Sequence, residues 1–435
     1  MSIRLSGRSR GRFGGRGLLD GELPLRPDLS VAAERVRHLP IMDEREETRA
    51  ACCCVVANAV LAYWQGARIH YSRDNSFYAA VRAGVPSWFS RSTVVAAVDL
   101  LAVAGLLDVL RTAPSPSARH RSRFSATPHL IQAVGLDHIS GLVFEDTPPV
   151  ILRCRDDRRA LDPLSVLRQA EMVEFNALTL DVRACNEFLA GFEISLRGDA
   201  AQALPTGLLK IGDICVNPRL RRYHRVFNGD LQHGGRWYGP WWQSVPSAVR
   251  PSLLIDGEPT VEIDYAACQL RLMFSYFGLP DPLNGEIRGN GQSADLYSID
   301  GVHRDTVKLA LLIMTNALSQ RSARKALTAQ LATIPAKSRG SEADRIMGAV
   351  RRRFPVLEPL WCSGIGLRLQ RTDSDVCAQV QLDMRSVGLP VLSIHDSFAC
   401  WERTEPVLRA CMRNAFEKVW HTNLQRKAAR ASSSG

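Results

Sequence analysis

Two short apolar segments, far apart in the chain, each end in an aspartate, and together they constrain the fold more than any other feature. Residues 261–264 read Val-Glu-Ile-Asp, and residues 391–396 read Val-Leu-Ser-Ile-His-Asp. The first has the pattern of a buried strand and the second that of a hairpin. An aspartate at the end of such a strand is held rigidly, and these two can meet only through the fold. We therefore expect an α+β chain with a pair of carboxylates at one sheet.

A pair of this kind suits phosphoryl transfer. That reaction uses two Mg²⁺ about 3.5 to 4 Å apart, one to lower the pKa of the attacking hydroxyl and one to neutralise the triphosphate. Hard cations prefer carboxylate oxygens. We predict that Asp264 and Asp396 hold two Mg²⁺, with Mn²⁺ as an alternative metal. A single aspartate after an apolar strand is more often a turn or cap residue, so the prediction depends on the neighbouring motifs.

These motifs resemble those of family A nucleic-acid polymerases, the bacterial DNA polymerase I types and single-subunit phage RNA polymerases. Residues 264–271, Asp-Tyr-Ala-Ala-Cys-Gln-Leu-Arg, are similar to motif A, and residues 394–398, Ile-His-Asp-Ser-Phe, to motif C. Between them, four residues recur at intervals of four on one face of a predicted helix, as in the fingers helix called motif B: Arg304, Lys308, Leu312 and Asn316.

The resemblance implies a role for each of these residues. Asp264 and Asp396 would be the catalytic metal ligands, and Arg304 and Lys308 would hold the triphosphate of a dNTP or NTP. Nucleotide selection would fall to Gln269, Leu312, Asn316 and Tyr265. Contacts with a DNA primer or template would come from Arg236, Gln243, Gln370, Asp375, Arg271 and His395.

The nucleotide-selecting residues depart from the family. Leu312 and Asn316 replace an aromatic residue and a tyrosine, and Gln269 stands where DNA polymerases usually have glutamate. Sugar choice depends on a side chain that fills the space of the 2′-hydroxyl or bonds to it. The departures therefore leave the choice between deoxyribose and ribose open. The Asp-Ser-Phe ending and residues 295–297, Asp-Leu-Tyr, favour the RNA polymerase form.

The N-terminal part predicts a second kind of domain. Apolar spacing predicts helices over residues 50–65 and 90–104, then a strand at 106–110, a basic loop and a return strand at 123–127. This order resembles a winged-helix domain, with residues 90–104 as its recognition helix. Its nucleic-acid contacts would include Arg91, Arg121 and Arg123. The alternative is a helical hairpin that packs on the second domain and binds no DNA.

Composition agrees with a nucleic-acid partner. The 435-residue chain carries a formal charge of +11, a balance that favours polyanions. Its eleven cysteines lack the spacing of zinc ligands and predict reduced, mostly buried thiols. No apolar run is long enough for a membrane span, and the Arg-rich start lacks the apolar region of a secretion signal. We expect a cytoplasmic protein with no membrane partner.

We therefore predict an α+β right-hand polymerase preceded by a winged-helix-like domain. The expected ranges are a disordered basic tail at 1–25, the winged-helix-like domain at 45–140, and the polymerase domain at 155–425, made of a helical thumb at 160–225, a palm with an antiparallel sheet at 226–280 and 370–425, and short fingers at 281–360. The expected function is a DNA polymerase or primase-polymerase, with a role in replicating a mobile element as an extension drawn from domain adjacency. The alternatives are a DNA-dependent RNA polymerase or RNA primase, and an inactive DNA-binding protein with a polymerase-like palm.

Overall fold

The computed structural model describes residues 22–39, 45–81, 85–111, 122–144, 147–155, 160–283, 295–331, 335 and 337–432. The chain forms two compact units, and both mix helices with mainly antiparallel strands, as the α+β prediction requires. The first contains Met1–Asn186, Glu193–His224 and Tyr238–Gly257; the second contains Glu187–Phe192, Arg225–Trp237 and Glu258–Gly435. These limits differ from the predicted division between residues 140 and 155.

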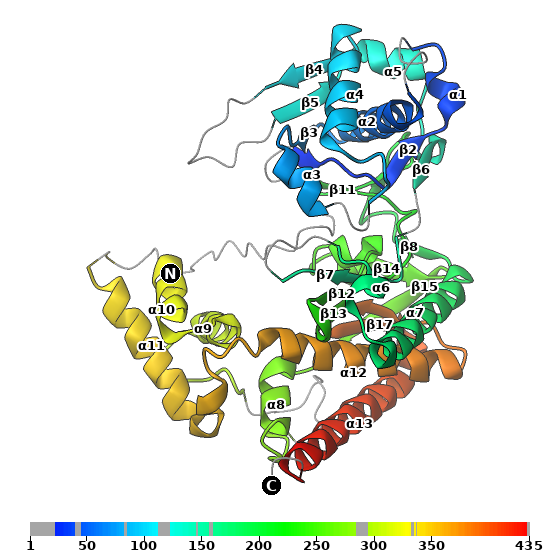
Figure 1. Cartoon of the computed structure of the whole chain (residues 1–435). Helices are drawn as coiled ribbons and strands as arrows, with labels where there is room; N and C mark the ends of the chain where they lie inside the picture. Colours follow the sequence, from blue (N-terminus) through cyan, green and yellow to red (C-terminus); the bar gives the residue numbers. More distant parts are fainter. Residues whose placement is uncertain are drawn as a thin grey trace. The chain divides into compact units, whose positions relative to one another are not determined.

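The first unit is built around one buried helix, α2 (Glu46–Trp64). Its residues from Ala51 to Ala62 are all buried, including the run of three cysteines, which serve as small core side chains. The helix packs against α4 (Arg91–Val103), β2 (Leu29–Val31) and β5 (Ser122–Ala126) (Figure 1). This burial on all sides explains its continuous apolar sequence.

The elements predicted for a winged-helix-like domain occur in the predicted order. Ser90 caps α4 by accepting from Thr93 N, and β4 (Leu107–Leu110) and β5 follow. Strand β3 (Arg68–Tyr71) pairs antiparallel with β5, which also pairs with β4, and β1 (Glu22–Pro24) adds a parallel strand beside β3. The remaining elements here are α1 (Ala33–Val36), α3 (Asn75–Val81), α5 (Pro128–Val134) and β6 (Leu142–Phe144), which pairs with β2.

The region predicted as a helical thumb is only partly helical. It contains α6 (Pro163–Val166) and α7 (Gln169–Ala190), but its second half forms short strands: β8 (Ile194–Leu196), β9 (Gln202–Ala203), β10 (Leu209–Ile211) and β11 (Ile214–Val216). Strands β9, β10 and β11 form a small antiparallel sheet, and β8 pairs with β14 (Leu253–Ile255). The expectation of helices throughout 160–225 is therefore wrong for residues 194–216.

An antiparallel sheet forms the centre of the second unit. Strand β15 (Glu258–Asp264) pairs with β17 (Ser397–Trp401), which also pairs with β16 (Leu392–Ile394). Helix α8 (Cys268–Ser275) follows β15 after a short turn, and α12 (Gly366–Ser386) packs against both α8 and α13 (Glu405–Ser432). Other strands of the chain are β7 (Val150–Arg153), β12 (His224–Asn228) and β13 (Asp230–Tyr238).

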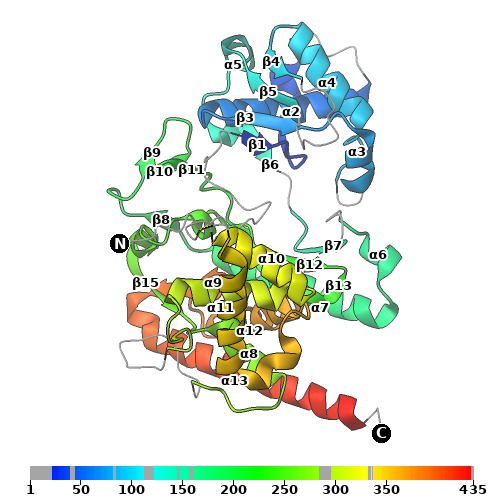
Figure 2. The same cartoon turned by 90° about the vertical axis from the view of Figure 1, so that its left-hand side faces the viewer.

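A group of helices occupies the predicted fingers. Helix α9 (Arg304–Asn316) packs against α10 (Gln320–Gln330) and α11 (Arg339–Arg353), and the three are adjacent in both views (Figures 1 and 2). Short 3₁₀ turns lie at Ile139–Gly141, Trp241–Ser244, Arg250–Ser252, Pro355–Leu360 and Glu402–Thr404. Among the helices of the described ranges, none combines the length and apolar character needed to cross a membrane.

Candidate active site

The register of the central sheet brings the two predicted metal-binding aspartates to adjacent strand ends. Asp264, the last residue of β15, is paired with Ser397, the first residue of β17. Asp396 immediately precedes Ser397, in the two-residue turn that joins β16 to β17. Its neighbour His395 has a φ of 64°, a left-handed conformation that closes this tight turn. Both aspartates are partly exposed as residues, although Oδ1 of Asp264 is itself buried.

A third carboxylate lies near this pair. Asp373, on α12, is buried, and its Oδ2 accepts from Arg236 Nη2 at 3.1 Å. The Cys268 thiol lies 3.6 Å from the other carboxylate oxygen. Burial raises the pKa of Asp373 to about 6, Arg236 opposes this, and the charge of Asp396 adds to it. The charge of Asp396 therefore acts on Asp373, which places both in one electrostatic environment.

The buried Cys268 thiol feels the same negative charges. Its pKa is raised well above the ordinary value, first by burial and then by Asp373, Asp396 and, more weakly, Asp264. Three carboxylates therefore surround the start of α8 with negative potential. Cations are attracted to such a place.

The ring of Tyr297 contacts the two predicted triphosphate-binding cations, and its phenol is affected by the charges of the aspartates. The guanidinium carbon of Arg304 and Nζ of Lys308 each lie 5.3 Å from the centre of the Tyr297 ring. Burial, followed by the charges of Asp396 and Asp264, raises the pKa of the Tyr297 phenol to about 12. Arg304 also pairs with Asp295 at 2.6 Å. Arg304 and Lys308 thus share one face of α9, as predicted, and contact a ring that lies within the field of the aspartates.

The carboxylate pair has the donor chemistry of a magnesium site completed by its substrate. Mg²⁺ usually keeps several waters and is held by one or two carboxylates together with substrate phosphates. Among the described residues, no group of three or more His, Cys, Asp or Glu is arranged to hold a metal. Asp264 and Asp396 supply the carboxylate oxygens that Mg²⁺ prefers, and a magnesium site at this pair stays a prediction.

The structure distributes the predicted nucleotide-selecting residues between two environments. Gln269 is partly exposed on α8, and Leu312 is 53% exposed on α9. Asn316 is exposed at the end of α9, where its Nδ2 donates to Leu312 O at 2.8 Å. Tyr265 is instead buried, and its hydroxyl donates to Met412 O at 2.6 Å. The ring and hydroxyl of Tyr265 are therefore used in the core, and its role in nucleotide selection stays a prediction.

The position of Arg271 contradicts its predicted contact with nucleic acid. Arg271 is fully buried, with its Nε 2.8 Å from Asp281 Oδ1 and its guanidinium carbon 4.3 Å from the centre of the Phe416 ring. A side chain in this position joins α8 to α13 and cannot reach a strand in solvent.

The other predicted contacts lie in several places. Arg236 pairs with Asp373, Gln370 is partly exposed on α12, and Asp375 pairs with two buried arginines. His395 is exposed in the β16–β17 turn, whereas Gln243 belongs to the first unit.

The predicted contacts of the winged-helix-like domain already have partners where they are described. Arg91 Nε donates to Arg73 O at 2.8 Å, and Arg123 pairs with Glu22 at 2.5 Å. Arg121 lies outside the described residues. Contact between these side chains and DNA stays a prediction.

Sequence reasoning missed most of the residues that α12 buries against β12 and β13. Arg371 and Asp373 lie in the sequence as an ordinary charged stretch, and Arg225 lies in a basic patch. Asp375 was predicted, but as a nucleic-acid contact. The available signal was the position of Arg371 and Asp373 within the apolar spacing of a helix. Charged residues at such positions are seldom solvated and usually have a buried partner.

Comparison of the chain with protein-family models and with curated proteins finds no match. The geometry of the site is therefore the basis of the functional argument.

Proposed function

We propose that this protein is a template-directed nucleotidyltransferase, a DNA polymerase or primase-polymerase that extends a nucleic-acid strand with two Mg²⁺. The observation that carries the proposal is the pairing of Asp264 with Ser397, which puts Asp264 beside Asp396. The resemblance to polymerase motifs A and C was drawn from residues far apart in sequence. Their meeting at one sheet edge is what a shared active site requires.

The cationic face of α9 supports the same proposal. Two cations four residues apart repel each other, and an incoming triphosphate would relieve that repulsion. Tyr297 holds both side chains in place through its ring. Arg304 is paired with Asp295, so phosphate would replace that carboxylate on binding.

In this proposal Asp264 and Asp396 hold the metal ions, and Arg304 and Lys308 bind and orient the triphosphate. Bound Mg²⁺ would lower the pKa of the primer hydroxyl and neutralise the negative charge of the leaving group. Lys308 would donate a proton to pyrophosphate. Gln269 and Asn316, both polar, would contact the sugar. Incorporation assays with dNTPs and with NTPs show which of the two the protein uses.

The first unit is proposed to bind DNA as a winged-helix-like domain. Support comes from the order α2, β3, α3, α4, β4, β5 and from the antiparallel order β3–β5–β4, both of which match the winged-helix arrangement. The exposed face of α4 is poor in side chains that read bases, and its Asp99 pairs with Arg73 at 2.7 Å and with Arg111 at 3.0 Å. Phosphate contact is therefore favoured over base readout.

The decisive experiment is Mg²⁺-dependent incorporation of labelled dNTPs and, separately, NTPs on primed and single-stranded DNA. We expect Asp264→Asn and Asp396→Asn each to reduce incorporation by at least about 10³-fold, because each removes charge that stabilises the transition state. The matched control is Asp344→Asn, which changes an exposed carboxylate that pairs with Arg324. It should retain activity within about twofold.

Loss of incorporation in both active-site variants, with activity kept in the control, would support the proposal. A well-folded wild type that incorporates neither substrate would reject it in favour of an inactive DNA-binding protein.

A further inference from the structure

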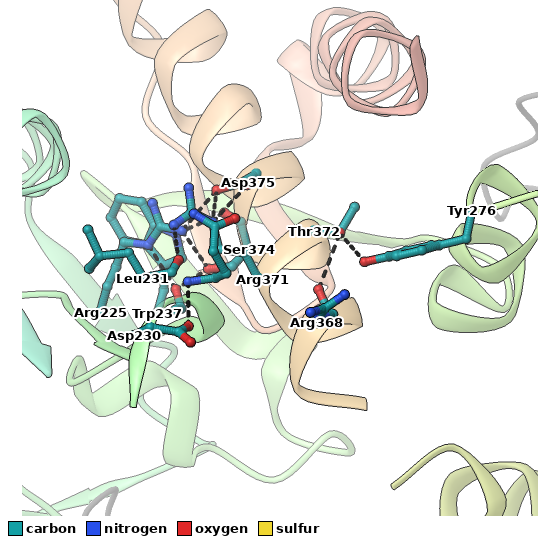
Figure 3. A network of polar contacts seen from close by, with 12 residues as sticks. Arg225, Asp230, Leu231, Trp237, Tyr276, Arg368, Arg371, Thr372, Ser374 and Asp375 are labelled. Atoms are coloured by element: carbon teal, nitrogen blue, oxygen red, sulfur yellow. Dashed lines mark hydrogen bonds and ion pairs between the residues drawn. The ribbon is translucent and has the colours of Figure 1, made fainter. Parts of the chain in front are cut away.

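Helix α12 and strands β12 and β13 enclose a cationic network in the second unit (Figure 3). Arg225 is fully buried, and its Nη2 lies 3.2 Å from Asp375 Oδ1. Arg371 Nε lies 2.9 Å from the other oxygen of the same carboxylate. Two guanidinium groups therefore share Asp375.

Aromatic rings and carbonyl oxygens stabilise the shared charge. The guanidinium carbons of Arg225 and Arg371 lie 5.2 and 5.3 Å from the centre of the Phe227 ring. Arg225 Nε donates to Gly235 O at 2.8 Å. These dipoles and ring faces accommodate positive charge without cancelling it, so the surface above the network favours an anion.

Arg368 is the exposed cation at this end of α12. Its Nε donates to His233 Nε2 at 3.3 Å, and within the described ranges its guanidinium forms no ion pair. Because Arg can only donate, His233 Nε2 must accept, and the ring proton is then on Nδ1. Nδ1 lies 2.6 Å from Asp230 Oδ1, so it donates to that carboxylate.

Asp230, His233 and Arg368 thus form a chain of hydrogen bonds, which we call the Arg368 relay. His233 is largely buried, with a 12% exposed side chain, whereas Arg368 is exposed. The relay engages the guanidinium by its Nε–H and leaves the outer N–H pair of Nη1 and Nη2 without a hydrogen-bond partner among the described residues. Two adjacent N–H groups held in one plane match the oxygens of a phosphate.

We propose that Arg368 binds a backbone phosphate of the nucleic acid, and that Asp230 and His233 are positioning residues for this contact. The proposal rests on the proposed function for the identity of the strand. The ligand class is a phosphodiester, and the contact is independent of base sequence.

The test measures binding of a fluorescent primer–template duplex to the full-length protein without Mg²⁺ or nucleotide, over a range of KCl concentrations. We expect Arg368→Gln to weaken binding about fivefold and to reduce the slope of log K against log [KCl] by about 0.9, as loss of one phosphate contact requires. The matched control is Arg413→Gln, an exposed arginine of α13 that loses the same charge.

Variants of His233 distinguish the positioning of the Arg368 guanidinium from the effect of its charge alone. His233→Leu keeps the charge of Arg368 but removes its acceptor, and we expect about a threefold weakening with a smaller change of slope. His233→Gln keeps an acceptor near the position of Nε2 and should restore most of the affinity. Circular dichroism of each variant checks that the fold is kept.

Equal salt slopes for Arg368→Gln and Arg413→Gln would overturn the proposal, as would a wild type that does not bind the duplex. A wild type that binds through Arg368 but incorporates no nucleotide would leave this contact supported and reject the polymerase function.

Discussion

Asp373 is a buried carboxylate whose ionisation should be visible in the stability of the protein. Burial raises its pKa from 3.8 to about 6, with Asp396 adding to the rise and Arg236 opposing it. Because the folded state binds this proton more tightly than the unfolded state, stability falls as the pH rises through this interval. We expect the wild type to lose about 2 to 3 kcal/mol between about pH 4 and pH 7 relative to Asp373→Asn, which cannot ionise.

The measurement is the free energy of unfolding in urea at several pH values for both proteins. The loss should be complete above about pH 7, where Asp373 is ionised in both states. Parallel pH profiles would show that Asp373 is charged in the folded state throughout the range.

Sequence patterns predicted Asp264 and Asp396 as site residues because each lies at the end of an apolar run that forms a strand. Asp373 gave no such signal, since an aspartate within a helix is normally solvated and only tertiary packing buries it. Arg271 shows the opposite error. It lies in the segment that resembles motif A, next to the predicted site, but the sequence does not show that its side chain points into the core.

At the scale of elements, the contact of α12 with β12 and β13 includes one carboxylate that pairs with two arginines. Arg225 and Arg371 both use Asp375, so removing Asp375 leaves two guanidinium groups without it, whereas removing Arg225 leaves Asp375 with Arg371. Removing one partner of a buried ion pair typically costs about 3 to 5 kcal/mol. We expect that cost for Asp375→Asn and less than about 2 kcal/mol for Arg225→Met, whose side chain still packs on Phe227 and Trp237.

Urea unfolding of the two variants at neutral pH measures this difference. A reference is Arg403→Met, which removes an exposed arginine paired with Glu258 and should cost no more than about 1 kcal/mol. Equal costs for Asp375→Asn and Arg225→Met would contradict this account, because the shared carboxylate would then contribute no more than one of its two arginines.

Helices with several turns were predictable, and the short strands of residues 194–216 were not. Helices α2 and α4 agree with their sequence patterns because their apolar residues recur over three or more turns. Strands β8 to β11 have only two or three residues each, too few for an alternating pattern. Their pairing partners decide their structure, and a single sequence does not identify those partners.

At the scale of the molecule, the division into two units does not follow the sequence order. The two predicted domains were separated between residues 140 and 155, yet the first unit continues to Gly257 with two interruptions. Leu208 explains part of this, because it is fully buried in the same core as Leu130 and Leu142. Contacts of this kind join distant segments and cannot be read from local composition.

This arrangement predicts the behaviour of fragments. Ile139 N donates to Thr206 O at 2.8 Å, and Arg219 Nη1 donates to Ile139 O at 3.0 Å. A fragment ending at Thr147 lacks these bonds and the Leu208 side chain, whose removal from a core typically costs about 2 to 5 kcal/mol. We expect the fragment 1–147 to unfold at a lower urea concentration than the fragment 1–257, and Leu208→Ala in the full chain to destabilise the first unit by a similar amount. Equal midpoints for the two fragments would show that the predicted boundary, rather than Gly257, marks the end of an independent domain.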